Sequence, residues 1–195
     1  MCGRYLVKSE LEKLKARFKI TLDMDKEFEF RPNYNAAPMQ KLLAIRQVED
    51  SRSLVSMQWS LLPSWSKERT LKFPTLNARG ETIAEKPTFR KPFERSRCII
   101  PNDGFYEWKK TGKNKEPFLI FVKDKEPAGF AGLWDSWKDR QTGETVESFT
   151  IVTTEANELV NPIHERMPVI LHPNDFDEWL DPDNHDTRSL QALIR

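Results

Sequence analysis

The second residue of the chain is a cysteine, and this position gives it chemistry that an internal cysteine lacks. A small residue here permits removal of Met1, which would leave an amine and a thiol on adjacent carbons. Such an amine, with an ordinary pKa of about 7.7 to 8.0, is about a tenth to a sixth neutral at pH 7, and a thiol near 8.5 is a few per cent thiolate. Cys2 could therefore act as an acyl-transfer nucleophile, or capture an aldehyde as an imine that closes to a thiazolidine. Taken alone, a cysteine at this position is more often simply a small residue suited to maturation.

Two pairs of residues with a spacing of two could bind an anion. Arg4 follows Cys2, and an extended chain would place both side chains on one face. A guanidinium there would lower the pKa of the thiol and hold an anionic substrate, although a lone arginine is more often a surface residue. Asn77 and Arg79 repeat this spacing before an expected helix start, which suits an anion. An isolated asparagine more commonly caps its own backbone.

A carboxylate and an imidazole could move protons. Glu107 lies among three aromatic residues, and desolvation there would raise its pKa toward a value useful for proton transfer. The same stretch could be a half-exposed strand in which Glu107 pairs with Lys109. His164 lies between two prolines, which favours a loop or extended segment where it shares a face with Arg166. A single histidine is more often structural than catalytic.

The tryptophans divide into two groups. Trp65, together with the turn residue Pro38, could form an exposed platform on which a nucleobase stacks. The hydrophobic core is the expected place of Trp59, Trp108 and Trp134.

Length and composition indicate one globular domain over residues 1–195. The chain is 38% hydrophobic, and no apolar stretch approaches the roughly 20 residues that span a bilayer. The first 20 residues lack the apolar region of an export signal, so we expect a cytoplasmic, nucleoid-associated protein without a membrane partner. The spacing of Cys2 and Cys98 matches no zinc-ligand pattern, so we expect no metal and reduced thiols.

The net charge of +1 conceals an uneven distribution. Residues 1–20 carry six basic and two acidic groups, and residues 65–97 carry nine basic and four acidic groups. Residues 171–195 instead carry two basic and six acidic groups. The basic segments could form a phosphate-binding surface or two solvated faces.

Hydrophobic periodicity and turn residues predict an α+β domain with a mainly antiparallel, curled or barrel-like sheet and flanking helices. A capping box formed by Ser9 and Glu12 predicts a helix over 9–19. Further helices are expected over 80–86, 154–160, 174–180 and 187–194. Strands are expected over 42–46, 54–59, 98–100, 118–123, 128–134 and 149–153, with hairpin tips at 111–115 and 139–144.

Eight short motifs in this order resemble one family, the SOS-response-associated peptidase (SRAP) family, whose members shield abasic sites in single-stranded DNA. The resemblance covers most of the chain. The motifs are Met1-Cys-Gly-Arg-Tyr5, Asn35-Ala-Ala-Pro38, Trp59-Ser-Leu-Leu-Pro-Ser-Trp65, Asn77-Ala-Arg-Gly-Glu-Thr82, Pro101-Asn-Asp-Gly-Phe-Tyr-Glu-Trp108, Ala131-Gly-Leu-Trp134, Thr153-Thr-Glu-Ala-Asn157 and Ile163-His-Glu-Arg-Met-Pro-Val-Ile-Leu171.

This resemblance implies a covalent thiazolidine crosslink between Cys2, after loss of Met1, and the ring-opened aldehyde of an abasic site. It implies that Asn77, Glu107 and His164 are the catalytic partners of Cys2 and that the same site removes Met1. It implies that the DNA-binding residues are Arg4, Arg79, Arg166, Trp65, Pro38 and Thr153. No cofactor and no obligate protein partner are implied, and we expect a monomer.

Two departures and two alternatives accompany this interpretation. Ser60 stands where the family usually has glycine, a change expected to be tolerated, and the family generally continues beyond Arg195, so we expect a C-terminally shortened form. An N-terminal-nucleophile cysteine amidohydrolase would also begin with Met-Cys-Gly, but it predicts a glutamine pocket and a further domain. A non-covalent single-stranded DNA-binding module would be indifferent to Cys2→Ala.

Overall fold

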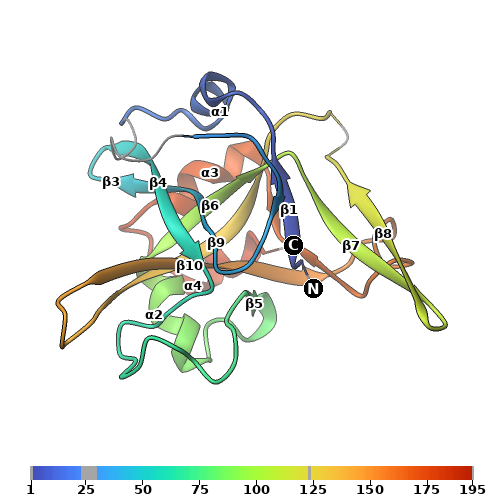
Figure 1. The fold of residues 1–195 in the computed structure, drawn as a ribbon. Coiled ribbons are helices and arrows are strands. Elements are labelled where there is room, and N and C mark those ends of the chain that lie inside the picture. The colour runs from blue at the N-terminus through green and yellow to red at the C-terminus, as the bar shows by residue number, and fades with distance from the viewer. Residues whose placement is uncertain (1, 23–29, 123, 195) are drawn as a thin grey trace.

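The computed structural model describes residues 2–22, 30–122 and 124–194, and its main feature is a closed barrel of strands (Figure 1). The strands are β1 (Arg4–Val7), β2 (Asn33–Ala36), β3 (Lys41–Val48), β4 (Ser51–Trp59), β5 (Asn77–Arg79), β6 (Arg97–Asn102), β7 (Gly104–Thr111), β8 (Asn114–Ile120), β9 (Ala128–Lys138), β10 (Thr145–Glu155), β11 (Arg166–Pro168) and β12 (Ile170–Leu171). The helices are α1 (Leu11–Phe18), η1 (Gly80–Thr82), α2 (Pro87–Arg95), η2 (Pro173–Asp175), α3 (Phe176–Leu180) and α4 (Thr187–Ala192).

The barrel closes because β10 pairs on both sides. It lies parallel to β4 and antiparallel to β9, and the ring runs β10-β4-β3-β6-β9. The short strands β5 and β11 pair with the C-terminal part of β10, and β12 pairs with β9. The predicted single α+β domain with a barrel-like, mainly antiparallel sheet is confirmed.

A second sheet carries the start of the chain. Its order is β2-β1-β7-β8, and β1 pairs with β7 so that Arg4 lies opposite Tyr106 and Leu6 opposite Gly104. The predicted hairpin tip between β7 and β8 is confirmed, with Gly112 at a φ of 63° (Figure 1). Only the start of β7 packs on the core, so the hairpin extends into solvent.

Aromatic side chains join the two sheets. The ring of Tyr5, on β1, meets Trp59 edge to face with centroids 5.3 Å apart and meets Phe130 at 6.0 Å. Trp59 in turn stacks on Phe149 at 6.2 Å. Edge-to-face and offset-stacked rings contribute about 0.5–1.5 kcal/mol per pair beyond their burial, so this cluster fixes β1 against the barrel.

The predicted first helix is present, but its predicted cap is wrong. Glu10 occupies the N-cap position of α1 without a side-chain hydrogen bond. Ser9 instead donates its hydroxyl to Asp103 at 2.5 Å, and the Asp103 carboxylate also accepts the backbone N–H groups of Lys8 and Ser9. The carboxylate of Asp103, between β6 and β7, therefore accepts the backbone N–H of Ser9, which the predicted capping box assigned to Glu12.

Two other predicted helices are wrong in extent or in type. Only residues 80–82 of the range 80–86 are helical, and the α-helix begins at Pro87, because proline is suited to the first helical position. The range 154–160 continues β10 to Glu155 and then turns, since the Asn157 side chain accepts the N–H of Val160 at 3.0 Å.

The remaining predicted elements hold with shifted boundaries. The ranges 174–180 and 187–194 are confirmed as helical, and the hairpin tip at 139–144 turns at Gly143 with a φ of 77°. The strand expected over 118–123 runs over Asn114–Ile120 instead, and position 123 lies outside the described residues. Pro117 is tolerated within it because β8 is an edge strand.

Only one of the three tryptophans predicted to lie in the core is fully buried. Trp59 is buried, whereas Trp108 and Trp134 are half-buried, and Arg46 lies 4.5 Å above the Trp134 ring. Trp137 and Trp179 are buried instead. No helix in the described ranges is long and apolar enough to cross a membrane.

Ser60, the departure from the family pattern, has a φ of 133°, a backbone conformation that residues other than glycine rarely adopt. Its backbone N–H donates to Phe149 O at 3.0 Å, and its hydroxyl accepts the N–H of Thr75 at 3.3 Å. The hydroxyl thus ties down the loop 60–75, an interaction that glycine could not make and that offsets part of the strain.

Candidate active site

Cys2 lies just before β1 and is completely buried. Its backbone carbonyl accepts a hydrogen bond from Asn77 Nδ2 at 3.0 Å, and its Sγ lies 3.8 Å from Arg4 O. Chain ends commonly fray unless other elements hold them. Here a side chain from β5 holds the start of β1 against the barrel.

Glu107 is the buried carboxylate next to Cys2. It lies on β7 and is 2% exposed, so the alternative of a half-exposed side chain paired with Lys109 is wrong. Lys109 lies opposite Glu116 in the hairpin, on a part of β7 that is exposed to solvent. If the β1–β7 register is extended by one residue, Gly3 faces Glu107, which places Glu107 beside Cys2.

Burial and the charge of Glu107 together raise the pKa of the Cys2 thiol to about 12. Burial is the larger cause, because a thiolate inside the core loses its hydration. At this pKa only about one thiol in 10⁵ is ionised at pH 7. The thiol therefore needs a neighbouring base before it can attack an electrophile.

The expectation that the Arg4 guanidinium lowers the pKa of this thiol is wrong, because the pKa is raised and Arg4 lowers it only through a backbone hydrogen bond. Arg4 is half-buried and donates through Nη1 to Asn35 Oδ1 at 2.8 Å. Asn35 lies on β2, which flanks β1. Arg4 is thereby held at the edge of the second sheet, where its guanidinium retains other donors for an anion.

Asn77 has a more specific position than a loop asparagine that caps its own backbone. It begins β5, which pairs in parallel with β10 so that Asn77 lies opposite Ile151. Its amide orientation is defined because the Cys2 carbonyl can only accept a hydrogen bond. Its Oδ1 is buried and has no hydrogen-bond partner among the described residues. An unsatisfied buried acceptor costs about 1–3 kcal/mol, so this oxygen marks a place for a donor.

Arg166 is a buried arginine held by a carboxylate. It is 8% exposed and donates to both oxygens of Glu81, at 2.5 and 2.9 Å, and to Thr153 O at 2.8 Å. The bidentate bond lowers the pKa of Glu81. A phosphate could reach Arg166 only by sharing it with Glu81 or displacing that carboxylate.

Arg79 is exposed and shares a cavity with Arg166. This cavity, of about 350 Å³, is also lined by two carboxylates, Glu155 and Glu165. Arg79 lies two residues after Asn77 and opposite Thr153 on β10. Strand pairing therefore connects the Cys2–Asn77 contact with the cavity that the two arginines line.

His164 lies in a turn immediately before β11, as the flanking prolines predict. Its Nδ1 accepts the backbone N–H of Arg166 at 3.0 Å. In the neutral ring this bond leaves the proton on Nε2, so the second nitrogen is a donor. The contact links His164 to the backbone of Arg166.

The remaining predicted DNA-binding residues have different exposures. Trp65 is 61% exposed and Pro38 is half-buried. Thr153 is fully buried, and its hydroxyl accepts from Arg166 Nη2 at 3.3 Å, so any part it plays in DNA binding passes through Arg166.

Two positioning residues were not singled out by the sequence, although both lie in its motifs. Asn35 holds Arg4, and Glu81 holds Arg166. Asn77, Arg79 and Glu81 alternate with a spacing of two, which was a usable signal for Glu81. Within the described part of the chain, no group of three or more His, Cys, Asp or Glu side chains could hold a metal ion.

Comparison with known proteins identifies the family and supports the fold. The profile of the family "SOS response associated peptidase (SRAP)" matches residues 1–195. The chain belongs to the SRAP family.

Its relatives are similar along the whole chain. "Abasic site processing protein YoqW" of Bacillus subtilis is 42% identical over 196 residues, which cover 100% of this chain and 87% of that protein. "Abasic site processing protein YoaM" of the same organism is 42% identical over 198 residues, covering 100% and 85%. A crystal structure of a protein from Bacteroides thetaiotaomicron superposes with a TM-score of 0.86 at 31% identity, covering 99% of this chain and 86% of that one.

The Glu81–Arg166 pair predicts a pH-dependent stability. Glu81→Gln should lower the free energy of unfolding by about 1–2 kcal/mol at pH 7, because Arg166 stays buried without its carboxylate and Glu81 is half exposed. Since the folded-state pKa of Glu81 is lowered, its contribution is complete above the unfolded pKa of about 4.3 and is lost as the pH falls through the folded value. Urea unfolding from pH 7 to pH 3 measures this.

Glu85→Gln is the matched control, because Glu85 is exposed on the same segment. Its unfolding should follow the parent protein within about 0.5 kcal/mol at every pH. A Glu81→Gln protein as stable as the parent at pH 7 would contradict the structural role of this pair.

Proposed function

We propose that this protein captures abasic sites in single-stranded DNA by a covalent thiazolidine crosslink to Cys2. The observation that carries the proposal is the burial of Cys2 between Asn77 and Glu107, at the one position where the chain can present an amine and a thiol together. The names of the relatives, abasic site processing proteins, support the substrate.

The first step uses the amine of Cys2 after Met1 has been removed. A ring-opened abasic deoxyribose carries an aldehyde at C1′, and the amine adds to it to form a carbinolamine. Loss of water then gives an imine. Asn77 Oδ1, a buried acceptor without a partner in the described chain, is suited to hold the N–H of the amine or the adduct.

The second step uses the thiol. Sγ adds to the imine carbon, the thiol proton reaches the nitrogen, and a five-membered thiazolidine closes. The overall reaction joins amine, thiol and aldehyde with release of one water, so it needs no oxidant or reductant. Because burial keeps the thiol protonated, Glu107 is proposed as the base that takes its proton and returns it to the nitrogen.

His164 is proposed to open the sugar. The Arg166 N–H occupies Nδ1, so the Nε2 proton is the one that can be donated to the ring oxygen. Its attachment to the backbone of Arg166 would place it beside the strand that Arg79 and Arg166 bind.

Arg4 and Arg79 are the proposed direct phosphate contacts, with Arg166 as a third that Glu81 shares. Trp65 and Pro38 would extend this face by stacking. The protein is proposed to bind DNA as a monomer. We further propose that the Cys2–Glu107 site removes Met1, with Glu107 as the base.

The requirement for Cys2 gives the test of the proposal. The parent protein should form an adduct with single-stranded DNA containing an abasic site that survives denaturing electrophoresis without borohydride. Cys2→Ala and Cys2→Ser keep an N-terminal amine but lack the thiol, so they should yield only an imine, visible after borohydride reduction. Cys98→Ser, a buried thiol elsewhere in the barrel, should crosslink like the parent.

A stable adduct with Cys2→Ala in the absence of borohydride would contradict the proposed thiazolidine. Equal retention of intact and abasic strands with no adduct from the parent would instead indicate a non-covalent binding module.

The roles of Glu107 and His164 are separable by timing. Glu107→Gln should retain Met1 and crosslink little, because it affects both processing and thiol transfer. His164→Ala should be processed normally but form the crosslink about 10²- to 10⁴-fold more slowly, the usual effect of losing a general acid. Reversal by the same path should slow equally. N-terminal mass and the rates of adduct formation and release measure these effects.

Glu116→Gln and His172→Ala are the controls, since both residues are exposed. A His164→Ala protein that forms and releases the adduct at the parent rate would return His164 to a structural role. Complete loss of Met1 from Glu107→Gln would separate processing from this site.

A further inference from the structure

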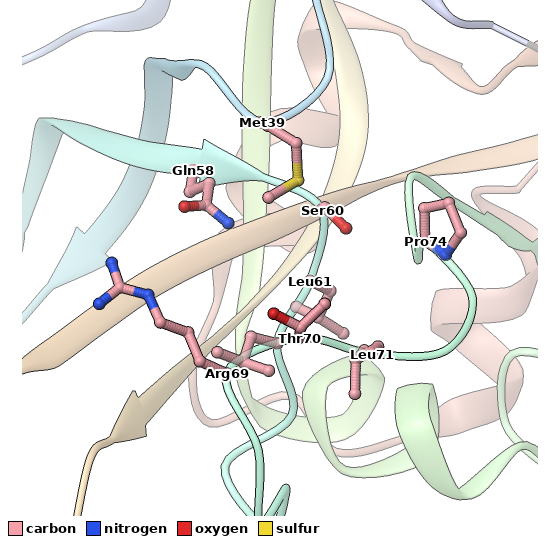
Figure 2. Close-up of a pocket in the computed structure, with 9 residues that line it drawn as sticks. Met39, Gln58, Ser60, Leu61, Arg69, Thr70, Leu71 and Pro74 are labelled. Atoms are coloured by element: carbon pink, nitrogen blue, oxygen red, sulfur yellow. The ribbon is translucent and has the colours of Figure 1, made fainter.

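A small cavity opens between the turn that follows β2 and the loop 60–75, and Cys2 is not among the residues that line it (Figure 2). Figure 2 shows Met39 above Ser60, Pro74 to its right, Gln58 to its left, and Thr70 and Leu71 below it. The full lining is Met39, Gln58, Ser60, Leu61, Leu62, Arg69, Thr70, Leu71 and Pro74.

The size of this cavity fits a single aromatic ring. Its volume is about 140 Å³. A cavity of about 150 Å³ lined by aliphatic side chains binds benzene, so one six-membered ring fills such a space. A purine, with two fused rings, would exceed it.

The lining combines apolar walls with a polar edge. Leu61, Leu71 and Pro74 offer apolar contact to the faces of a ring. Gln58 contributes an amide whose oxygen accepts and whose nitrogen donates, and this amide has no side-chain hydrogen bond among residues 2–22, 30–122 and 124–194. A pyrimidine base presents adjacent donors and acceptors on its edge, which an amide can match.

The rim carries a cation suited to a phosphate. Arg69 lines the cavity and pairs with Glu144 at 2.6 Å, but both side chains are about half exposed. Exposed ion pairs of this kind contribute little, so a phosphate can compete for the guanidinium. Lys67 and Lys72 lie on the same loop.

The cavity lies close to the candidate active site along the chain. Pro74 precedes Asn77 by three residues, which span at most about 11 Å when extended. A stacked strand advances about 3.4 Å per nucleotide, so the span from Pro74 to Asn77 corresponds to about three nucleotides at most. Met39 adjoins Pro38, and Arg69 shares a loop with Trp65, so two residues of the proposed DNA face flank the opening.

We infer that this cavity is a pyrimidine-binding subsite, which takes one base of the same DNA strand that carries the abasic site. The inference rests on the proposed function, because that function supplies the strand. Gln58 would bind the edge of the base, Leu71 and Pro74 its faces, and Arg69 the adjoining phosphate.

Binding to a strand that cannot crosslink tests this subsite. The probe is a labelled strand of eleven nucleotides with a central tetrahydrofuran, an abasic analogue without an aldehyde, flanked by adenines. A single thymine is moved through the flanking positions, and affinity is measured by fluorescence anisotropy. One position within three nucleotides of the analogue should bind about 5- to 100-fold more tightly, the range that burial of one base provides.

Two variants should abolish this positional preference while still binding the all-adenine strand as the parent does. Gln58→Leu removes the polar edge, and Thr70→Trp fills the cavity from an exposed loop position. Gln47→Leu and Thr111→Trp make the same changes outside the cavity, at a half-buried and an exposed position, and should keep the preference.

Equal affinity for thymine at every position would overturn the subsite, and so would an undiminished preference in both variants. The tetrahydrofuran strand separates this result from the proposed function, because it reports no crosslink. A thymine preference in a protein that never crosslinks an aldehyde-bearing strand would support the subsite and refute the crosslink. Crosslinking without any preference would do the reverse.

Discussion

The hydrogen bond from Asn77 Nδ2 to the Cys2 carbonyl is the contact on which the rest of the site depends. It ties the first described residue to β5, and β5 is itself fixed by its parallel pairing with β10. Tyr5 holds the next part of β1 through its ring contacts with Trp59 and Phe130. These contacts hold Cys2 and β1 against the barrel, although chain ends are ordinarily the least ordered part of a domain.

Burial of Cys2 lowers the reactivity of its thiol. A fully buried thiol beside a carboxylate stays protonated near neutral pH, so Cys2 is held with little intrinsic nucleophilicity. In the proposed mechanism, proton transfer to Glu107 determines when the sulfur can react, which would favour the abasic-site aldehyde over other electrophiles. The Arg4 side chain donates to Asn35 instead of approaching the thiol. Its guanidinium therefore lies at the edge of the site and does not promote ionisation of the thiol.

The sequence was sufficient to predict the barrel, but not the short strands that bring the candidate site residues together. Long alternating or apolar strands such as β3, β4 and β9 were predictable, because each buries enough side chains to show a pattern. The three-residue strands β5 and β11 are too short for any periodicity, and only their pairing with β10 makes them strands. Asp103 could not be foreseen as the support of α1, since that contact joins positions more than 90 residues apart. The partners Asn35 and Glu81 depend on the same kind of long-range placement.

The intact mass of the protein after incubation with abasic single-stranded DNA tests the central claim most directly. The account predicts a species equal to the chain without Met1, plus the strand, minus one water, and proteolysis of that species should place the DNA on the peptide that begins with Cys2. An adduct on another residue, an adduct on a chain that retains Met1, or no covalent species at all would contradict it.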